Sequence, residues 1–251
     1  MIKFFRKFRQ NSLAEGKTGK YLKYAIGEIL LVMVGILLAL QVNNWNEIRK
    51  NKKVEMNLYI NLVSSLEADA IDITTILKNI NKGLDAQKVF IEHSYEAILE
   101  NYSIDDIENL IDQTHTVGMS FFPRYGAYNL LTDNGFLPLI SSERIKNNLV
   151  QLYDRSYRRY EHIDASIEQN NQLYLKRIVH GELRVLSKNY KLQLHDGFDI
   201  HKFNVHFQEL VKQCINIYSI ANTVKNSLES LQLETNNLLQ QIRKELRDRQ
   251  F

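Results

Sequence analysis

The stretch FQELVKQCINIYSIANTVKNSLESLQLETNNLLQQI, residues 207–242, decides the fold of this chain. Its stripe of mostly apolar residues advances in alternating steps of three and four, through Phe207, Leu210, Cys214, Ile217, Ala221, Val224, Leu228, Leu231, Thr235, Leu238 and Ile242. This spacing places the stripe on one side of an α-helix. Because it persists for about five heptads, it predicts a coiled coil or a long helix of a bundle.

Two further stripes have the same helical period. One runs through Leu62, Leu66, Ala70, Ile73, Leu77, Ile80 and Leu84, and the other through Ile145, Leu149, Leu152, Ser156, Tyr160, Ile163 and Ile167. We expect Ser141 to cap the second of these helices, with Glu143 in its first turn. No strand pattern of comparable strength occurs in the sequence. The predicted fold class is therefore all-α, an elongated helical-bundle domain of long, heptad-patterned helices.

Turn-forming residues gather at four points, which we expect to be corners of the bundle: Asn101-Tyr102-Ser103, Gly118 to Gly126, Asn134-Gly135 and His195-Asp196-Gly197. Short helices are predicted over about residues 104–112 and 125–132, the latter closed by Gly135 in a left-handed conformation. No Pro or Gly occurs between Ala39 and Gly83. The helix that carries the first stripe is therefore expected to begin far upstream of it.

An apolar run, AIGEILLVMVGILLALQV, occupies residues 25–42. As a helix it would reach about 27 Å, enough to cross the hydrocarbon core of a bilayer. A cleaved signal peptide is the alternative, but Ala39-Leu40-Gln41 is a poor cleavage site. Seven Lys and Arg residues precede the run, which favours a cytoplasmic N-terminus. We thus expect a basic tail (1–24), a transmembrane helix (25–42) in the bacterial inner membrane and a periplasmic helical-bundle domain (43–251).

Polar and small residues inside this run are candidates for function. Glu28 is a carboxylate within an apolar span, where ionisable residues commonly have a role. It shares a helical side with Gly35 and Ala39, a small-x-x-x-small pair that lets helices approach closely. This pattern favours packing against a second copy or a membrane-protein partner. Proton relay through Glu28, as in ion-driven transducing subunits, is the alternative, and tolerated placement near the interface is another.

Aromatic residues crowd the corner that contains Pro123. Phe121, Phe122, Arg124, Tyr125 and Tyr128 have the composition of a binding hot spot for a partner segment or a small ligand, and equally that of a well-packed bundle cap. A second set, Tyr153, Tyr157 and Tyr160 beside Arg155, Arg158 and Arg159, predicts a face of tyrosine and arginine that would serve a partner or solvation.

Charge and composition narrow the function classes. The chain has 32 Lys and Arg against 29 Asp and Glu, and its first 23 residues hold seven of the cations and one of the acids. The remainder, with 25 cations and 28 acids, is mildly acidic, so we expect no nucleic-acid partner. The single cysteine, Cys214, excludes an intramolecular disulfide framework.

Histidines and carboxylates between His180 and His206 invite a metal site, but His201 and His206 are five residues apart and no His-Glu-x-x-His or paired-Cys motif occurs. We therefore expect no metal and no cofactor. No nucleophile motif or phosphate-cradling glycine loop stands out either, so the protein is not expected to be an enzyme. The identity of any small-molecule ligand stays open.

Two segments carry a resemblance to a known family. KYAIGEILLVMVGILLALQVNNWNE, residues 23–47, and FFPRYGAYNLLTDNGFLPLI, residues 121–140, resemble a family of bacterial single-pass membrane proteins that is known only as a domain of unknown function. The resemblance implies an inner-membrane anchor with a helical domain outside, in Gram-negative bacteria, and no activity. We expect an oligomeric, membrane-anchored scaffold or interaction protein. A periplasmic sensory or accessory subunit is the alternative.

Overall fold

The computed structural model describes residues 18–185 and 198–249, which form helices and connecting segments without a strand. The all-α prediction is thereby confirmed. The chain divides into two compact units, Met1–Glu55 and Met56–Phe251. One helix, α2 (Thr18–Glu92), contributes residues to both units. Its continuity agrees with the absence of Pro and Gly between Ala39 and Gly83.

Within the first unit, residues 25–42 are helical and none of the apolar window is buried. By length and composition this segment could cross a membrane. The prediction of a candidate membrane helix is confirmed to that extent.

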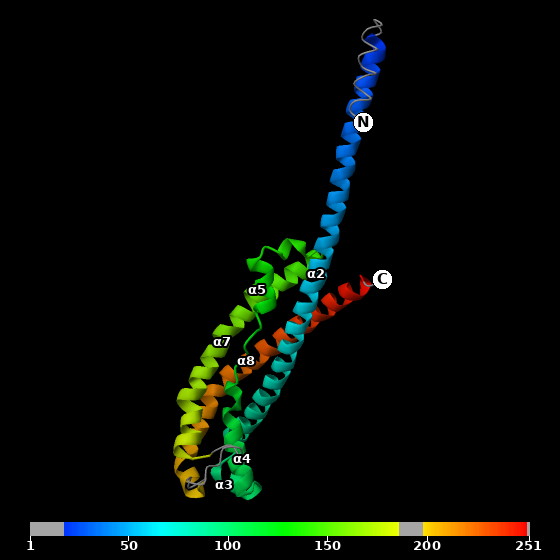
Figure 1. The fold of residues 1–251 in the computed structure, drawn as a ribbon. Helices are drawn as coiled ribbons and strands as arrows, with labels where there is room; N and C mark the ends of the chain where they lie inside the picture. The colour runs from blue at the N-terminus through cyan, green and yellow to red at the C-terminus, as the bar shows by residue number, and fades with distance from the viewer. Residues whose placement is uncertain (1–17, 186–197, 250–251) are drawn as a thin grey trace, which may run out of the picture. The chain divides into compact units, whose positions relative to one another are not determined.

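The second unit is built on three long rods (Figure 1). The first is α2 from residue 56 to Glu92, and the last is α8 (Ile200–Asp248), which Asp199 caps by accepting a hydrogen bond from the backbone N–H of His201. The middle rod consists of α6 (Glu143–Val150), η3 (Gln151–Tyr157), α7 (Arg158–Asn170), η4 (Asn171–Leu175) and η5 (Arg177–Glu182).

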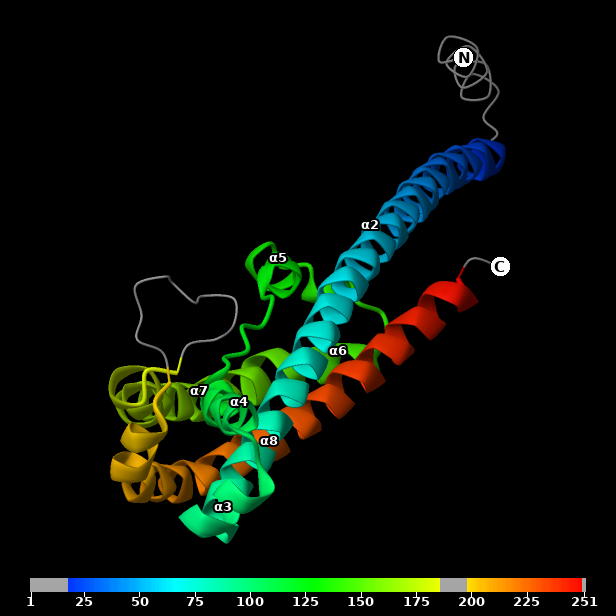
Figure 2. The ribbon, with the colours of Figure 1, turned by 90° about the horizontal axis from the view of Figure 1, so that it is seen from below.

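Cross-rod contacts show that α8 runs antiparallel to both other rods. Arg249 lies over the ring of Tyr59, Arg243 pairs with Glu67, and Gln232 donates to Thr74, so residue numbers fall along α8 as they rise along α2. The contacts Asn148 to Gln241 and Ser156 to Glu234 show the same relation with the middle rod. Figure 2 shows α8 beside the lower part of α2.

The long stripe of α8 is buried within the chain. All eleven predicted positions, from Phe207 to Ile242, are inside the core. The α2 stripe is buried as well, except for the half-buried Ala70. Because α2 and the middle rod of the same chain cover these residues, α8 is a long bundle helix, one of the two alternatives that its heptads left open.

The middle rod departs from the predicted period. Three of its segments, η3, η4 and η5, are π-helical, with an extra residue in each turn. Leu149, Tyr153 and Tyr157 therefore remain on one side in steps of four, and all three are buried. The predicted stripe positions Ser156 and Ile163 are only half-buried as a result. The expected N-cap was also misplaced by one residue, since the side chain of Ser142 accepts from Ile145.

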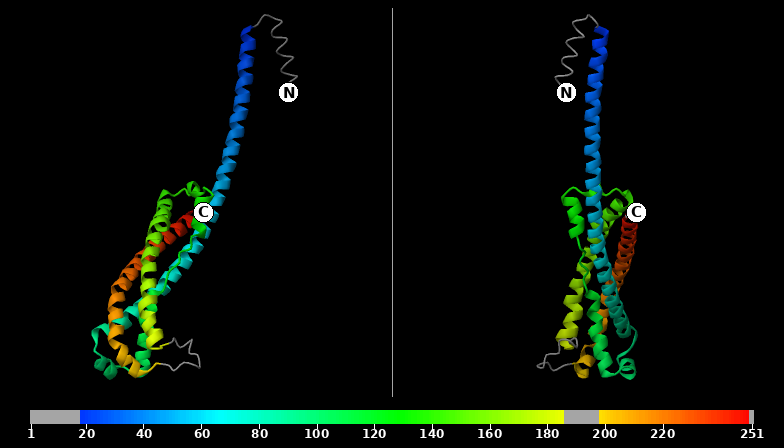
Figure 3. Two further views of the ribbon diagram at one scale, coloured as in Figure 1. Left: turned by 90° about the vertical axis from the view of Figure 1, so that its left-hand side faces the viewer. Right: turned by 45° about the vertical axis from the view of Figure 1, so that its right-hand side comes forward.

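Five short helices lie in the connection between α2 and α6. In chain order they are α3 (Tyr95–Asn101), α4 (Ile104–Thr114), η1 (His115–Gly118), α5 (Gly126–Asp133) and η2 (Leu137–Leu139). Figure 3 shows α3 and α4 at one end of the second unit and α5 towards the other.

Both predicted short helices are confirmed, and so is the left-handed Gly135 at φ 65°. The corners at 101–103, 118–126 and 134–135 are non-helical over most of their length, in agreement with the turn signals. The predicted corner at His195–Gly197 lies outside the described residues.

Candidate functional site

The aromatic corner that the sequence singled out is tied to the rods by one buried carboxylate. The side chain of Asp69, on α2, has an exposed fraction of 0%, and that of Arg124 has 44%. The Nη1 of Arg124 donates to Asp69 Oδ1 at 2.9 Å and lies 2.7 Å from Asp72 Oδ2. The backbone N–H of Arg124 also donates to Asp69, at 3.2 Å. Arg124 therefore fixes the corner to α2.

The middle rod meets the same carboxylate through Tyr157, which also contacts α8. The hydroxyl of Tyr157 donates to Asp69 Oδ2 at 3.0 Å and lies 3.3 Å from Thr235 Oγ1 on α8. Burial raises the pKa of Asp69 above its ordinary value, although Arg124 and Tyr157 act in the opposite direction. A buried carboxylate with this many donors fixes the mutual register of the segments that supply them.

Two tyrosines of the corner hold its second side. Tyr125 donates to Glu161 at 2.9 Å, and Tyr128 donates to Asp154 at 2.7 Å. Burial, followed by these hydrogen bonds to carboxylates, raises the pKa of both phenols above the ordinary value. Both hydroxyls thus remain protonated donors at physiological pH.

Aromatic rings fill the space behind the corner. Tyr128 stacks on Tyr153 with ring centroids 4.5 Å apart, and Phe121 meets Tyr157 edge to face at 5.7 Å. Phe121 is buried, whereas the neighbouring Phe122 has an exposed fraction of 76%. Of the corner residues, Phe122 thus has the greatest freedom to meet a partner, and a binding role for the corner stays a prediction.

The predicted face of tyrosine and arginine is wrong. Its tyrosines turn into the core and its arginines turn to solvent, because helical spacing already places the two sets on opposite sides of the rod. Tyr153, Tyr157 and Tyr160 are buried, and Arg155, Arg158 and Arg159 are exposed.

Candidate residues of the first unit lie on the apolar helix. Glu28 and Ala39 are exposed, and a Cβ added at Gly35 would meet no atom within 4 Å. The surface of this helix is thus open to lipid or to another helix, and the role of these residues stays a prediction.

The histidines of the second unit that the structure describes do not gather at one place. His206 Nε2 is 3.9 Å from Glu182 Oε2, and His180 Nδ1 is 2.7 Å from the carbonyl oxygen of Val185. His195 and Asp196 lie outside the described residues. Within the described ranges, no group of three or more His, Cys, Asp or Glu side chains is arranged to hold a metal ion.

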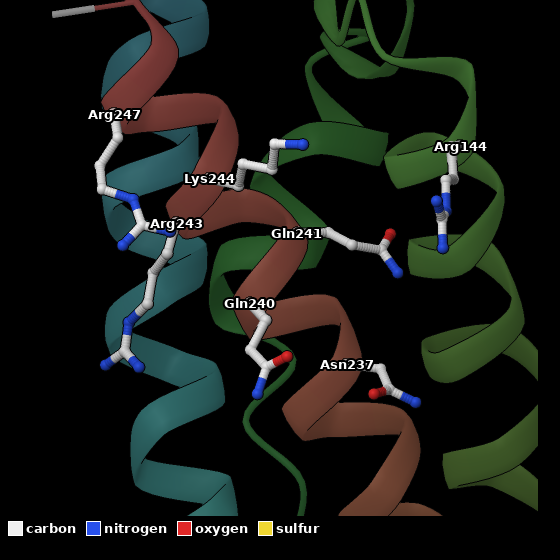
Figure 4. A pocket seen from close by; sticks show the side chains of 7 residues that line it. All are labelled: Arg144, Asn237, Gln240, Gln241, Arg243, Lys244 and Arg247. Carbon is white, nitrogen blue, oxygen red and sulfur yellow. The ribbon is translucent and has the colours of Figure 1, made fainter.

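A basic hollow of about 630 Å³ lies over the C-terminal part of α8 (Figure 4). Four cations line it, Arg144 of α6 and Arg243, Lys244 and Arg247 of α8. Three amides complete the lining, Asn237, Gln240 and Gln241.

The view in Figure 4 separates the lining into two sides. Lys244 and Gln241 extend from α8 towards α6, which carries Arg144, whereas Arg243 and Arg247 extend over α2. Arg243 pairs with Glu67 of α2. Sequence reasoning missed this site. The run RKELR, residues 243–247, was a signal for one side of it, but Arg144 is about a hundred residues away in the sequence.

These features define a class, an all-helical protein with an apolar N-terminal helix long enough to cross a membrane and a second unit of packed helices. The chain belongs to a family of unknown function, DUF6090, whose family model matches residues 28–189. The match covers most of one segment of the predicted resemblance and all of the other. No curated protein matches the chain, and no solved structure does.

Proposed function

We propose that this protein is a single-pass, membrane-anchored interaction protein of the bacterial envelope, which acts by binding rather than by catalysis. The observation that carries the proposal is the uncovered apolar helix. Large apolar side chains such as Leu31 and Val42 are exposed along residues 25–42, whereas the apolar stripes of the second unit are covered. Exposed apolar surface on this scale marks contact with lipid or with another protein.

The location follows from the same segment. The basic residues that precede it favour a cytoplasmic N-terminus, which would put the second unit in the periplasm and the helix in the inner membrane. There the second unit would position other envelope components.

Self-association would use the small residues of the apolar helix. The stripe of α8 is buried within the chain, so it is not the surface for a second copy. Gly35 and Ala39, with Glu28 on the same helical side, leave room for a neighbouring helix.

Crosslinking with mass spectrometry, at native expression level in the membrane of origin, tests this proposal. Self-crosslinks through Lys20 and Lys23 are expected for the wild type and are expected to fall in the double variant Gly35→Leu, Ala39→Leu. Met33→Leu, on the opposite helical side, is the matched control and should crosslink as the wild type does. Release of the wild type from membranes by alkaline carbonate would contradict anchoring, and equal self-crosslinking in the two variants would contradict this helix contact.

A sensory or accessory subunit of a membrane complex is the second candidate. The exposed Phe122 at the corner favours it, since an aromatic side chain that projects from a firmly held segment suits a partner contact. Crosslinks from the corner to a multi-span protein, lost in Phe122→Ser, would support this candidate over the scaffold. Use of Glu28 in ion-driven transduction is tested by Glu28→Gln, and unchanged activity of the host complex would exclude it.

A further inference from the structure

The basic hollow gathers cations that the described part of the chain does not neutralise. Arg243 has a partner in Glu67, but among residues 18–185 and 198–249 no carboxylate lies within ion-pair distance of Arg144, Lys244 or Arg247. An anion in the hollow would neutralise these cations.

The position of Arg144 in its helix is electrostatically unfavourable unless an anion lies near it. Basic residues near the C-terminus of α8 are favourable by themselves, because the helix dipole is negative there. Arg144 is the second residue of α6, where the dipole is positive and a cation is unfavourable. It also faces the cationic end of α8 (Figure 4). The interaction with the helix dipole therefore explains why cations occur at the end of α8, but it does not explain Arg144.

The amide side chains of the basic hollow provide hydrogen-bond donors beside the cations. The carbonyl oxygen of Gln241 accepts a hydrogen bond from Asn148 Nδ2 at 2.9 Å. This contact occupies the acceptor of Gln241 and leaves its NH₂ group to donate. Donors from the amide of Gln241, the guanidinium group of Arg144 and the ammonium group of Lys244 suit a ligand that carries several acceptor oxygens and negative charge.

We propose that the basic hollow binds the phosphate group of a phosphate-bearing anion. Guanidinium groups bind phosphate in bidentate fashion, and Lys244 would add a point charge. Arg144 and Lys244 would hold the phosphate from the two sides, with Gln241 as a neutral donor. The volume of about 630 Å³ exceeds that of a single phosphate and leaves room for the group that bears it.

Two sources share this chemistry, a phospholipid headgroup and a soluble organic phosphate. The hollow lies at the end of the second unit where Arg249 covers Tyr59 and Arg243 pairs with Glu67. Along the chain this end is nearest to the apolar segment, since Tyr59 follows Val42 by 17 residues. Anion binding in the hollow does not require self-association through the apolar helix.

The test uses the full chain in a neutral detergent at fixed, low ionic strength. Inorganic pyrophosphate, followed by calorimetry, is the soluble probe. Phosphatidylglycerol, with phosphatidylcholine as the zwitterionic reference, is the lipid probe and is followed by native mass spectrometry. The variant Arg144→Gln, Lys244→Gln, Arg247→Gln removes the charge of the hollow. The matched control, Lys82→Gln, Arg159→Gln, Arg177→Gln, removes two arginines and one lysine from exposed positions elsewhere.

Wild type and control should bind at least one probe, and the hollow variant should bind it about tenfold more weakly or worse. Binding of phosphatidylglycerol alone identifies a headgroup site, binding of pyrophosphate alone identifies a soluble ligand, and binding of both supports the shared chemistry. No binding by the wild type, or equal loss in the control, overturns the proposal. If the triple variant is not helical by circular dichroism, Arg144→Gln alone should still weaken binding, and unchanged affinity there also overturns it.

Discussion

Loss of the Arg124 side chain should destabilise the second unit at neutral pH and much less at acidic pH. Breaking a buried ion pair costs about 3–5 kcal/mol, and an exposed pair contributes about 0–1 kcal/mol. Here the carboxylate is fully buried and the guanidinium is 44% exposed. Tyr157 and the backbone N–H of Arg124 would continue to donate to Asp69. We therefore expect Arg124→Met to cost about 2 kcal/mol.

The pH dependence follows from Asp69. Its pKa is raised by burial, so its ionisation in the folded state costs stability as the pH rises. Arg124 offsets part of that cost only while Asp69 is ionised. The loss in free energy of unfolding caused by Arg124→Met should therefore be largest at neutral pH. It should shrink as the pH falls through the raised pKa of Asp69, because the carboxylate is then protonated. Asp69→Asn in the same chain should recover part of the loss at neutral pH, because the buried charge is then absent.

The single cysteine provides the assay. Cys214 is buried in the core of the second unit, so brief maleimide labelling across a urea series reports its unfolding. The labelling pulse is given at one neutral pH after equilibration at each test pH. Arg159→Met, an exposed arginine for which the structure shows no ion pair within the described residues, is the control and should cost less than about 0.5 kcal/mol. A loss for Arg124→Met no larger than the control's, or the same loss near pH 4 as at neutral pH, would refute the reasoning.

Three further predictions test the core. In urea unfolding, Leu228→Ala should lower the free energy of unfolding by about 2–5 kcal/mol, because this side chain is buried. Leu233→Ala should lower it by less than about 0.5 kcal/mol, because this side chain is 63% exposed on the same helix. Similar losses for the two variants would contradict the register of α8. Gly83→Ala should destabilise by about 1–3 kcal/mol, since its Cβ would lie 2.6 Å from Val117 Cγ1, whereas Gly126→Ala, with no atom within 4 Å, should be neutral or slightly stabilising in the same assay. Burial raises the pKa of Cys214 to about 12, so the native thiol should resist alkylation at pH 8 and react fully in denaturant; rapid labelling without denaturant would show that the core opens there.

Much of the fold could be predicted from local pattern. The burial of a helix face depends on a repeat within a few turns, so the stripe from Phe207 to Ile242 identified both the helix and its buried side. Gly135 identified a left-handed turn, because a residue without Cβ adopts that backbone at low cost. The apolar run at residues 25–42 identified a candidate membrane helix by length alone.

The site was less accessible to sequence reasoning. Asp69 lies beside a half-buried stripe position, and the sequence around it does not predict that its side chain is buried. Arg124 and Tyr157, which are distant in sequence, donate hydrogen bonds that offset the cost of burying this carboxylate. The π-helical turn η3, which contains Tyr153 and Tyr157, depends on how the rod meets its neighbours.

The sequence by itself determined which segments are helical, which faces are apolar and where the chain turns, because those properties arise from interactions within a few residues. The tertiary structure decided which charges meet. Arg144 reached the cationic end of α8, and Asp69 came to lie under the corner at Arg124, only through the antiparallel packing of three rods. Electrostatic pairing depends on distance in space, and the order of residues along the chain does not specify that distance.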